Sequence, residues 1–263
     1  MRLSVRSCLL GFVVAFGWLS AQPLSAADIH VMSSGGLTAA FKALAPRFEA
    51  QSGHRIALVL GPSMGTSEDA IPVRLKRGEP ADLLLMVGYS LAGLVKEGTV
   101  SSDSYVDLAQ SRIGLAVRES APLPDIATLD SFRQALLAAP SIAYSDSASG
   151  VYIEREMFRK LGLHDQLAPK SRMIVSERVG NIVARGEAAF GFQQMSELLP
   201  VKGIRVVGPI PEAVQSVTVF SAGIPKASSQ ADAARELLAF LRSPEAAAAM
   251  RESGMDPIGQ QPK

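Results

Sequence analysis

The sequence predicts an α/β protein in which two Rossmann-like lobes enclose a central ligand cleft. Short apolar strands are each followed by a loop of small polar residues and then by a helix, and this order recurs along the chain. The strand pattern restarts near residue 113, which indicates a second lobe. Apolar residues make up 48 % of the 263 residues and charged residues 19 %, enough to build packed cores. Repeated strand–loop–helix units favour mostly parallel sheets with helices on both faces.

The first lobe is predicted from the spacing of apolar residues between clear stop signals. Leu37, Phe41, Leu44 and Phe48 recur at helical spacing, and Gly53 ends that helix. The strand at 83–87 is wholly apolar, as expected of a strand buried on both faces. In chain order the predicted elements are a strand at 28–32, a helix from 37 up to Gly53, a strand at 56–60, a helix at 70–77 and a strand at 83–87.

The second half of the chain repeats the alternation of strands and helices. Glycine marks the ends of its elements, as Gly186 does after the predicted helix at 179–185. The predicted strands are 113–117, 141–144, 173–176, 189–193, 204–207 and 217–224, and the predicted helices are 129–137, 151–161, 179–185, 231–241 and 244–252.

The two lobes are expected to be discontinuous in sequence. We predict that lobe 1 comprises 28–108 and 215–263, and that lobe 2 comprises 109–214. The crossings are placed at 107–112 and 209–216, because no longer linker is present.

The first 27 residues have the pattern of a secretory signal peptide. Basic residues precede the apolar run 9–19, and Ser25-Ala26-Ala27 supplies small residues for cleavage. The run is too short to span a bilayer, and no later run reaches that length, so we expect no membrane insertion. Cleavage after 27 would remove Cys8, the only cysteine, and leave no thiol or disulfide. The predicted location is the periplasm.

Charge excludes one class of partner. The chain has 26 basic and 25 acidic residues, a net charge of +1, and no basic run. Such a chain is not expected to bind nucleic acid. The expected ligand is a small molecule held at a local site.

Three loops share one composition and one position. Each follows a predicted strand and precedes a helix, where parallel strands present ligand sites and helix N-termini attract anions. Taken singly, each serine could be a helix cap and each glycine a turn former. Their coincidence favours a site for a small anion, with candidate residues Ser33, Ser34, Gly35, Ser63, Met64, Gly65, Ser145, Ser147, Ser149 and Gly150.

Side chains near these loops could complete such a site. Arg74 follows the second loop by one helical turn, and Arg178 precedes a predicted helix. A guanidinium can clamp a carboxylate with two hydrogen bonds, although either arginine alone could equally be a solvated surface residue. Gln193 could offer amide donors at the end of its strand, or simply be a surface residue.

Metal and cofactor sites are not expected. His30, His54 and His164 are isolated and show no ligand spacing, and the Gly-x-Ser-x-Gly, Walker and dinucleotide fingerprints are absent.

The loops carry a family resemblance over essentially the whole chain after residue 27. Ser33-Ser34, Gly-Pro-Ser-Met-Gly at 61–65, Arg-Gly-Glu-Pro-Ala-Asp at 77–82 and Ala-Arg-Gly-Glu-Ala at 184–188 resemble the periplasmic molybdate-binding proteins, type II components of ABC importers. The resemblance implies two lobes that close over an oxyanion, with Ser33 or Ser34 and Ser63 as ligands. The chain departs from this pattern at 144–152 and 192–197, where the family has a proline-containing loop and a Tyr and an Asp.

Other motifs resemble the bacterial aconitate isomerases, periplasmic enzymes with the same fold. The motifs are Pro62 to Gly65, Ala70 to Pro72, 79–82 with 86–88, 144–152 and Gly-Phe-Gln-Gln at 191–194. This resemblance implies interconversion of trans- and cis-aconitate, a tricarboxylate, by an allylic proton shift without a cofactor.

An isomerase also needs a general base. Asp146, Tyr152 and Glu177 are candidates by position, and the spacing singles out none of them.

Two further hypotheses remain open at this point. The protein could bind a tricarboxylate or a molybdate-like oxyanion and deliver it to an ABC permease, for which the same loops suffice. It could also be a periplasmic protein whose cleft has no physiological ligand.

Overall fold

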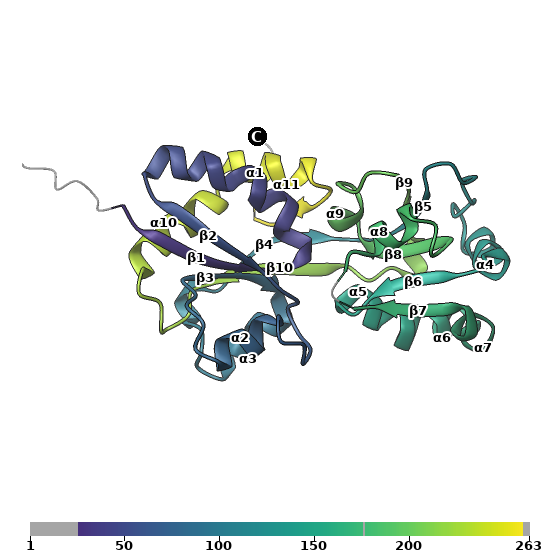
Figure 1. Cartoon of the computed structure of the whole chain (residues 1–263), viewed down its shortest axis with the longest axis horizontal. Helices are drawn as coiled ribbons and strands as arrows, with labels where there is room; N and C mark the ends of the chain where they lie inside the picture. Colours follow the sequence, from purple (N-terminus) through teal and green to yellow (C-terminus); the bar gives the residue numbers. More distant parts are fainter. Residues whose placement is uncertain (1–25, 176, 260–263) are drawn as a thin grey trace, which may run out of the picture.

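The computed structural model describes residues 26–175 and 177–259, and it consists of two lobes that each have their own sheet (Figure 1). The predicted signal peptide lies almost entirely outside the described residues. Within the described part of the chain, no helix is long and apolar enough to cross a bilayer.

The first lobe contains a six-stranded sheet in the order β11-β4-β10-β3-β1-β2. Strand β3 is buried at all five positions, as its apolar sequence predicts. The strands are β1 (Asp28–Ser33), β2 (Arg55–Leu60), β3 (Leu83–Val87), β4 (Val106–Ser111), β10 (Thr218–Gly223) and β11 (Asp256–Pro257).

Helices cover both faces of this sheet (Figure 1). Leu37 and Phe41 of α1 join Leu237 and Met250 in one core, while the opposite face packs Ile71 and other residues against β3. The helices of this lobe are α1 (Gly35–Ser52), α2 (Ile71–Lys76), α3 (Gly88–Lys96), α10 (Ala231–Leu241) and α11 (Pro244–Glu252).

The second lobe has a five-stranded sheet in the order β7-β6-β8-β5-β9. Phe132, Phe158 and Phe192 fill the core on one face, and Val179 and Ile182 of α8 pack on the other. Its elements are β5 (Ile113–Arg118), α4 (Leu129–Ala138), β6 (Ile142–Ser145), α5 (Ala148–Tyr152), a π-helical turn at Ile153–Met157, α6 (Phe158–Lys160), α7 (His164–Leu167), β7 (Ser171–Ile174), α8 (Val179–Ala184), β8 (Phe190–Gln194), α9 (Met195–Leu198) and β9 (Ile204–Pro209).

Both sheets are mixed, so the expectation of mostly parallel sheets is wrong. Strands β1, β2 and β3 are parallel, but β10 pairs antiparallel with β3 and β4. In the second sheet β6 is parallel to β7 and β8, whereas β5 is antiparallel to β8 and β9. Strand β5, which follows the first crossing, and strand β10, which follows the second, each run antiparallel to both of their neighbours.

The first crossing lies at the end of the predicted segment 107–112. Strand β4 occupies most of that segment and pairs with β10, with Thr218 opposite Ser111. The chain therefore passes from the first sheet to the second at Arg112. Asp107 and Gln110 interrupt the apolar residues of this segment, so it lacks the apolar run by which a strand is recognised.

Asp82 joins distant parts of the first lobe. Its buried carboxylate accepts hydrogen bonds from the backbone N–H of His30 (2.9 Å), from the Ser228 hydroxyl (2.8 Å) and from the N–H groups of Ser229 and Gln230 (both 3.1 Å). Burial raises the pKa of Asp82, but these hydrogen bonds outweigh it and hold the pKa below the ordinary value of an aspartate. The ionised side chain thus ties β1 to the start of α10.

Asp82→Ala should lower the free energy of unfolding by about 2–4 kcal/mol at neutral pH, because the buried N–H groups lose their acceptor. Urea unfolding would measure the change. Since the pKa is lowered in the folded state, the stabilisation is present above the ordinary aspartate pKa and is lost as pH falls below it. The fully exposed Asp165, changed to Asn, is the control and should cost less than about 0.5 kcal/mol. Equal losses in both variants would contradict this role.

Candidate functional site

The cleft lies where strand ends of both lobes meet. Two adjoining pockets share Gly35, Pro62, Ser147 and Glu197. The first pocket is lined mainly from the first lobe, and the second receives the loops that follow β6 and β7. The predicted meeting of serine- and glycine-containing loops is therefore present in the structure, and it surrounds a small cavity lined by both polar and apolar groups.

The N-terminus of α1 forms one wall of the first pocket. Ser34 caps this 18-residue helix, and Gly35 and Gly36 form its first turn. The Ser34 hydroxyl is buried and has no hydrogen-bond partner within the described part of the chain. Ser33 is fully buried behind it, and its hydroxyl donates to the Ser34 carbonyl at 3.2 Å. N–H groups of the first helical turn, which have no acceptor within the helix, suit an anion when a serine hydroxyl lies beside them.

The second loop lies opposite. The buried Ser63 hydroxyl accepts a hydrogen bond from the backbone N–H of Val87 at 2.8 Å, which fixes the loop against the end of β3. Ser63 and Met64 line the first pocket, whereas Gly65 lies outside both pockets. Gly65 has φ of 101°, which explains a glycine there by backbone conformation.

The third loop contributes a cluster of hydroxyl groups from the second lobe. Ser145 lies 2.7 Å from Ser147 and 3.3 Å from Ser149, measured between hydroxyl oxygens. Ser145 and Ser147 line the second pocket, while Ser149 is buried beneath them. Gly150 supports the turn, because a Cβ there would lie 1.6 Å from the Ser145 carbonyl oxygen.

Arg178, Asp146 and Gln193 also line the second pocket, as their predicted roles require. The Gln193 side chain is held at both ends. Its carbonyl accepts the backbone N–H of Val179 at 3.0 Å, and its amide donates to Glu197 at 2.9 Å. Gln193 thus links the loop that carries Arg178 to the floor of the cleft.

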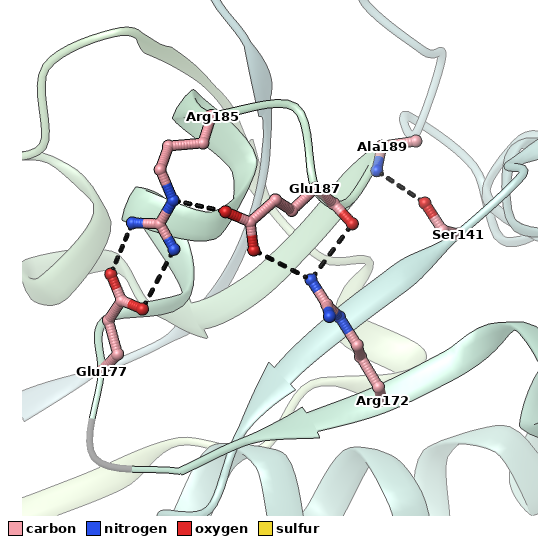
Figure 2. Close-up of polar contacts among 6 residues, drawn as sticks. All are labelled: Ser141, Arg172, Glu177, Arg185, Glu187 and Ala189. Carbon is pink, nitrogen blue, oxygen red and sulfur yellow. Dashed lines mark hydrogen bonds and ion pairs between the residues drawn. The ribbon is translucent and has the colours of Figure 1, made fainter.

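Glu177 borders the same pocket, but its carboxylate is already engaged (Figure 2). Arg185 donates to both of its oxygens, at 2.7 and 3.1 Å. Arg185 also bonds Glu187 at 2.5 Å, and Arg172 reaches the Glu187 carbonyl at 3.2 Å. The hydrogen bonds from Arg185 lower the pKa of Glu177, so it is a weak base.

Arg74 and Tyr152 do not line either pocket. The Arg74 guanidinium bonds the Glu79 carboxylate at 2.7 Å and the Asp69 carbonyl at 3.0 Å, because the chain turns back after α2 and brings Glu79 beside it. Tyr152 donates its hydroxyl to the Val214 carbonyl at 2.9 Å and lines a different cavity behind the cleft. Neither position supports the ligand or base role predicted from the sequence.

Glu197 is the residue that the sequence analysis missed. It lies on the four-residue helix α9, is 7 % exposed and lines both pockets. Burial raises its pKa to about 7, and the charge of Asp146 adds to that effect. The positive charge of Arg178 and the hydrogen bonds from Gln193 and Gln194 oppose it. The sequence showed a departure from the molybdate-binding pattern at 192–197, but nothing in it assigned a role to Glu197.

Candidate metal ligands do not gather in this cleft. Within residues 26–175 and 177–259, no group of three or more His, Cys, Asp or Glu side chains could hold an ion.

Comparison with known proteins identifies the family to which the chain belongs. The family model described as bacterial extracellular solute-binding protein matches residues 29–256. An aconitate isomerase from Pseudomonas sp. is 48 % identical over 93 % of this chain and 92 % of its own length. The molybdate-binding protein ModA of Azotobacter vinelandii is 25 % identical over 92 % of this chain and 95 % of its own length. The resemblance indicated by the sequence motifs is confirmed.

Solved structures share the two-lobed fold. The Azotobacter vinelandii periplasmic molybdate-binding protein superposes with a TM-score of 0.70 at 20 % identity, over 89 % of this chain and all of its own. The sulfate-binding protein SubI of Mycobacterium tuberculosis gives 0.69 at 18 % identity, over 89 % of this chain and 88 % of its own. The predicted fold class is confirmed.

Glu197→Gln should stabilise the protein increasingly as pH rises. The raised pKa means that the folded state favours the protonated carboxyl, so wild-type stability falls as pH rises from the ordinary glutamate range toward about 7. The glutamine side chain of the variant cannot ionise and escapes this loss. The difference in unfolding free energy between variant and wild type should grow by about 2–3 kcal/mol from pH 5 to pH 8. Urea unfolding at both pH values measures it, and a constant difference would refute the raised pKa.

Proposed function

The chain belongs to the family of bacterial extracellular solute-binding proteins, and within that family we propose that it is an aconitate isomerase. It interconverts trans- and cis-aconitate by an allylic proton shift. The reaction moves a proton and a double bond within one molecule, so the chemistry requires no redox or group-transfer cofactor.

One observation carries the proposal: the 48 % identity to an aconitate isomerase extends along 93 % of the chain. The whole architecture of lobes and loops is therefore shared with that enzyme, not a single motif. The serine hydroxyls and the arginine that line the cleft are consistent with a small substrate that bears several carboxylates.

Aconitate has three carboxylates, and the cleft offers three sets of donors. The first is the N-terminus of α1 with the unpaired Ser34 hydroxyl. The second is the loop of Ser63 and Met64. The third is the cluster of Ser145 and Ser147 with Arg178 nearby. Neutral N–H and O–H donors bind carboxylates without a strongly basic patch, which fits the near-neutral charge of the chain.

The same groups would assist the chemistry. Removal of a methylene proton leaves an allylic anion whose charge spreads onto the neighbouring carboxylates. Donors already fixed by the protein, such as the first turn of α1, stabilise that charge without reorganising during the reaction.

A second candidate function is transport. The molybdate- and sulfate-binding relatives have the same fold, and the cleft would suit delivery of a small anion to an ABC permease. The two functions place the same demands on the binding loops and differ only in whether the ligand is changed.

The proposed location is the periplasm. Membership of an extracellular solute-binding family supports it, together with the signal-peptide pattern at 1–27.

Turnover in D₂O tests the enzyme directly. Purified protein, treated with chelator, is mixed with trans-aconitate and followed by proton NMR. We expect cis-aconitate signals to grow, with deuterium entering the methylene group to the extent that the transferred proton exchanges with solvent. Line broadening of the ligand without turnover would overturn the isomerase proposal in favour of binding alone. No change at all would exclude the tricarboxylate and direct attention to an oxyanion.

Ser63→Ala and Arg74→Ala compare a residue that lines the cleft with one that does not. Loss of the Ser63 hydroxyl leaves the Val87 N–H without its acceptor and loosens the loop, so trans-aconitate affinity should fall about tenfold. Arg74→Ala breaks an ion pair outside both pockets, so affinity should change less than about twofold. Calorimetric titration measures both. Equal weakening by the two substitutions would contradict the position assigned to Arg74.

A further inference from the structure

Glu197 occupies the junction between the two lobes. It comes from the second half of the chain, yet its carboxylate lies against the first turn of α1 in the first lobe. A Cβ added to Gly35 would lie 1.9 Å from the Glu197 Oε1 atom, so glycine at that position leaves the space that the carboxylate fills. The carboxyl group is thus at the wall common to both pockets.

The other candidate bases are less well placed. Glu177 is clamped by Arg185, and the Tyr152 hydroxyl donates to a backbone carbonyl outside the cleft. Asp146 is half-buried and lines only the second pocket. Glu197 is the buried carboxyl that faces both pockets.

We propose that Glu197 is the residue that carries the proton in the allylic shift, an inference that rests on the proposed isomerase function. Its carboxylate lies beside the anion-binding turn of α1, where a substrate carboxylate would place the neighbouring methylene group within reach.

The proposed isomerisation needs only one protein group to take the proton and to return it. The carboxylate oxygen takes a proton from the methylene carbon, and the electron pair of that C–H bond forms the new double bond. The old double bond opens toward the former vinyl carbon, which takes the proton back from the Glu197 acid. Glu197 returns to its carboxylate form, and no oxidant, reductant or second substrate is consumed.

The surroundings suit a group that must take and return a proton. A pKa of about 7 leaves both forms populated near neutral pH, which is favourable for general acid–base catalysis. Gln193 holds the side chain in place through its 2.9 Å hydrogen bond, and its own amide is oriented by the Val179 N–H. The position of the carboxyl oxygen is therefore fixed before substrate arrives.

The test compares wild type, Glu197→Gln and Glu197→Asp in turnover and binding. We expect Glu197→Gln to lower kcat by about 10²–10⁴-fold, the range typical of a lost acid–base group. Calorimetric affinity for trans-aconitate should not fall by more than about threefold, because the glutamine keeps the shape of the side chain. Glu197→Asp should recover part of the activity, since it restores an ionisable carboxyl.

The pH dependence of turnover distinguishes a catalytic role of Glu197 from a purely structural one. Wild-type kcat/KM should rise with pH through about 7 as Glu197 ionises, and Glu197→Gln should lack this limb. The matched control is Glu119→Gln, an exposed glutamate beyond the far end of β5, which should leave kcat and the profile unchanged.

The outcomes separate this inference from the proposed function. Wild-type turnover that Glu197→Gln retains would overturn the role of Glu197 and leave the isomerase intact. Wild-type protein that binds trans-aconitate without converting it would overturn both. A thermal melt shows that the glutamine variant is folded, and activity in Glu197→Asp provides a second check if it is not.

Discussion

The side chain of Glu197 reaches from α9 of the second lobe to the first turn of α1 in the first, at a place nearly closed to water. Much of the cleft is arranged around this carboxyl group. Gly35 lacks a side chain where the oxygen lies, Gln193 uses its amide to hold it, and Arg178 supplies the positive charge that opposes the cost of burial. Burying an ionisable group is unfavourable unless such partners are provided. The two lobes therefore meet through a polar contact at this point.

Arg178 and Glu177 are neighbours in sequence with different tasks. Both line the second pocket, but the Glu177 carboxylate is engaged in the network with Arg185, Glu187 and Arg172 (Figure 2). Exposed ion pairs of this kind add little to stability. The bidentate Arg185–Glu177 pair does restrict the direction of the loop, and this helps to place Arg178 beside the cleft.

Sequence patterns predicted the local structure well where several signals agreed. Helix α11 begins and ends as predicted, because Ser243 caps it, Pro244 suits its first turn and Gly254 follows its end. The serine and glycine loops were recognisable for the same reason. The partners of long side chains could not be predicted in this way. Arg74 pairs with Glu79 because the chain turns back after α2, and the sequence pattern does not show that turn. Glu197 lies on a helix too short to show periodicity, and its burial depends on α1, which is far away in the sequence.

A cleft that only bound an anion would gain nothing from a carboxyl group on its wall. Ionised, Glu197 repels a carboxylate ligand, and protonated it offers one hydrogen bond that a serine could supply at any pH. Arginine, serine and backbone N–H groups already provide the attraction. A carboxyl with a pKa near neutrality is useful where a proton must leave the ligand and return to it. The unfavourable burial of Glu197 therefore favours catalysis over transport as the use to which this binding-protein fold is put.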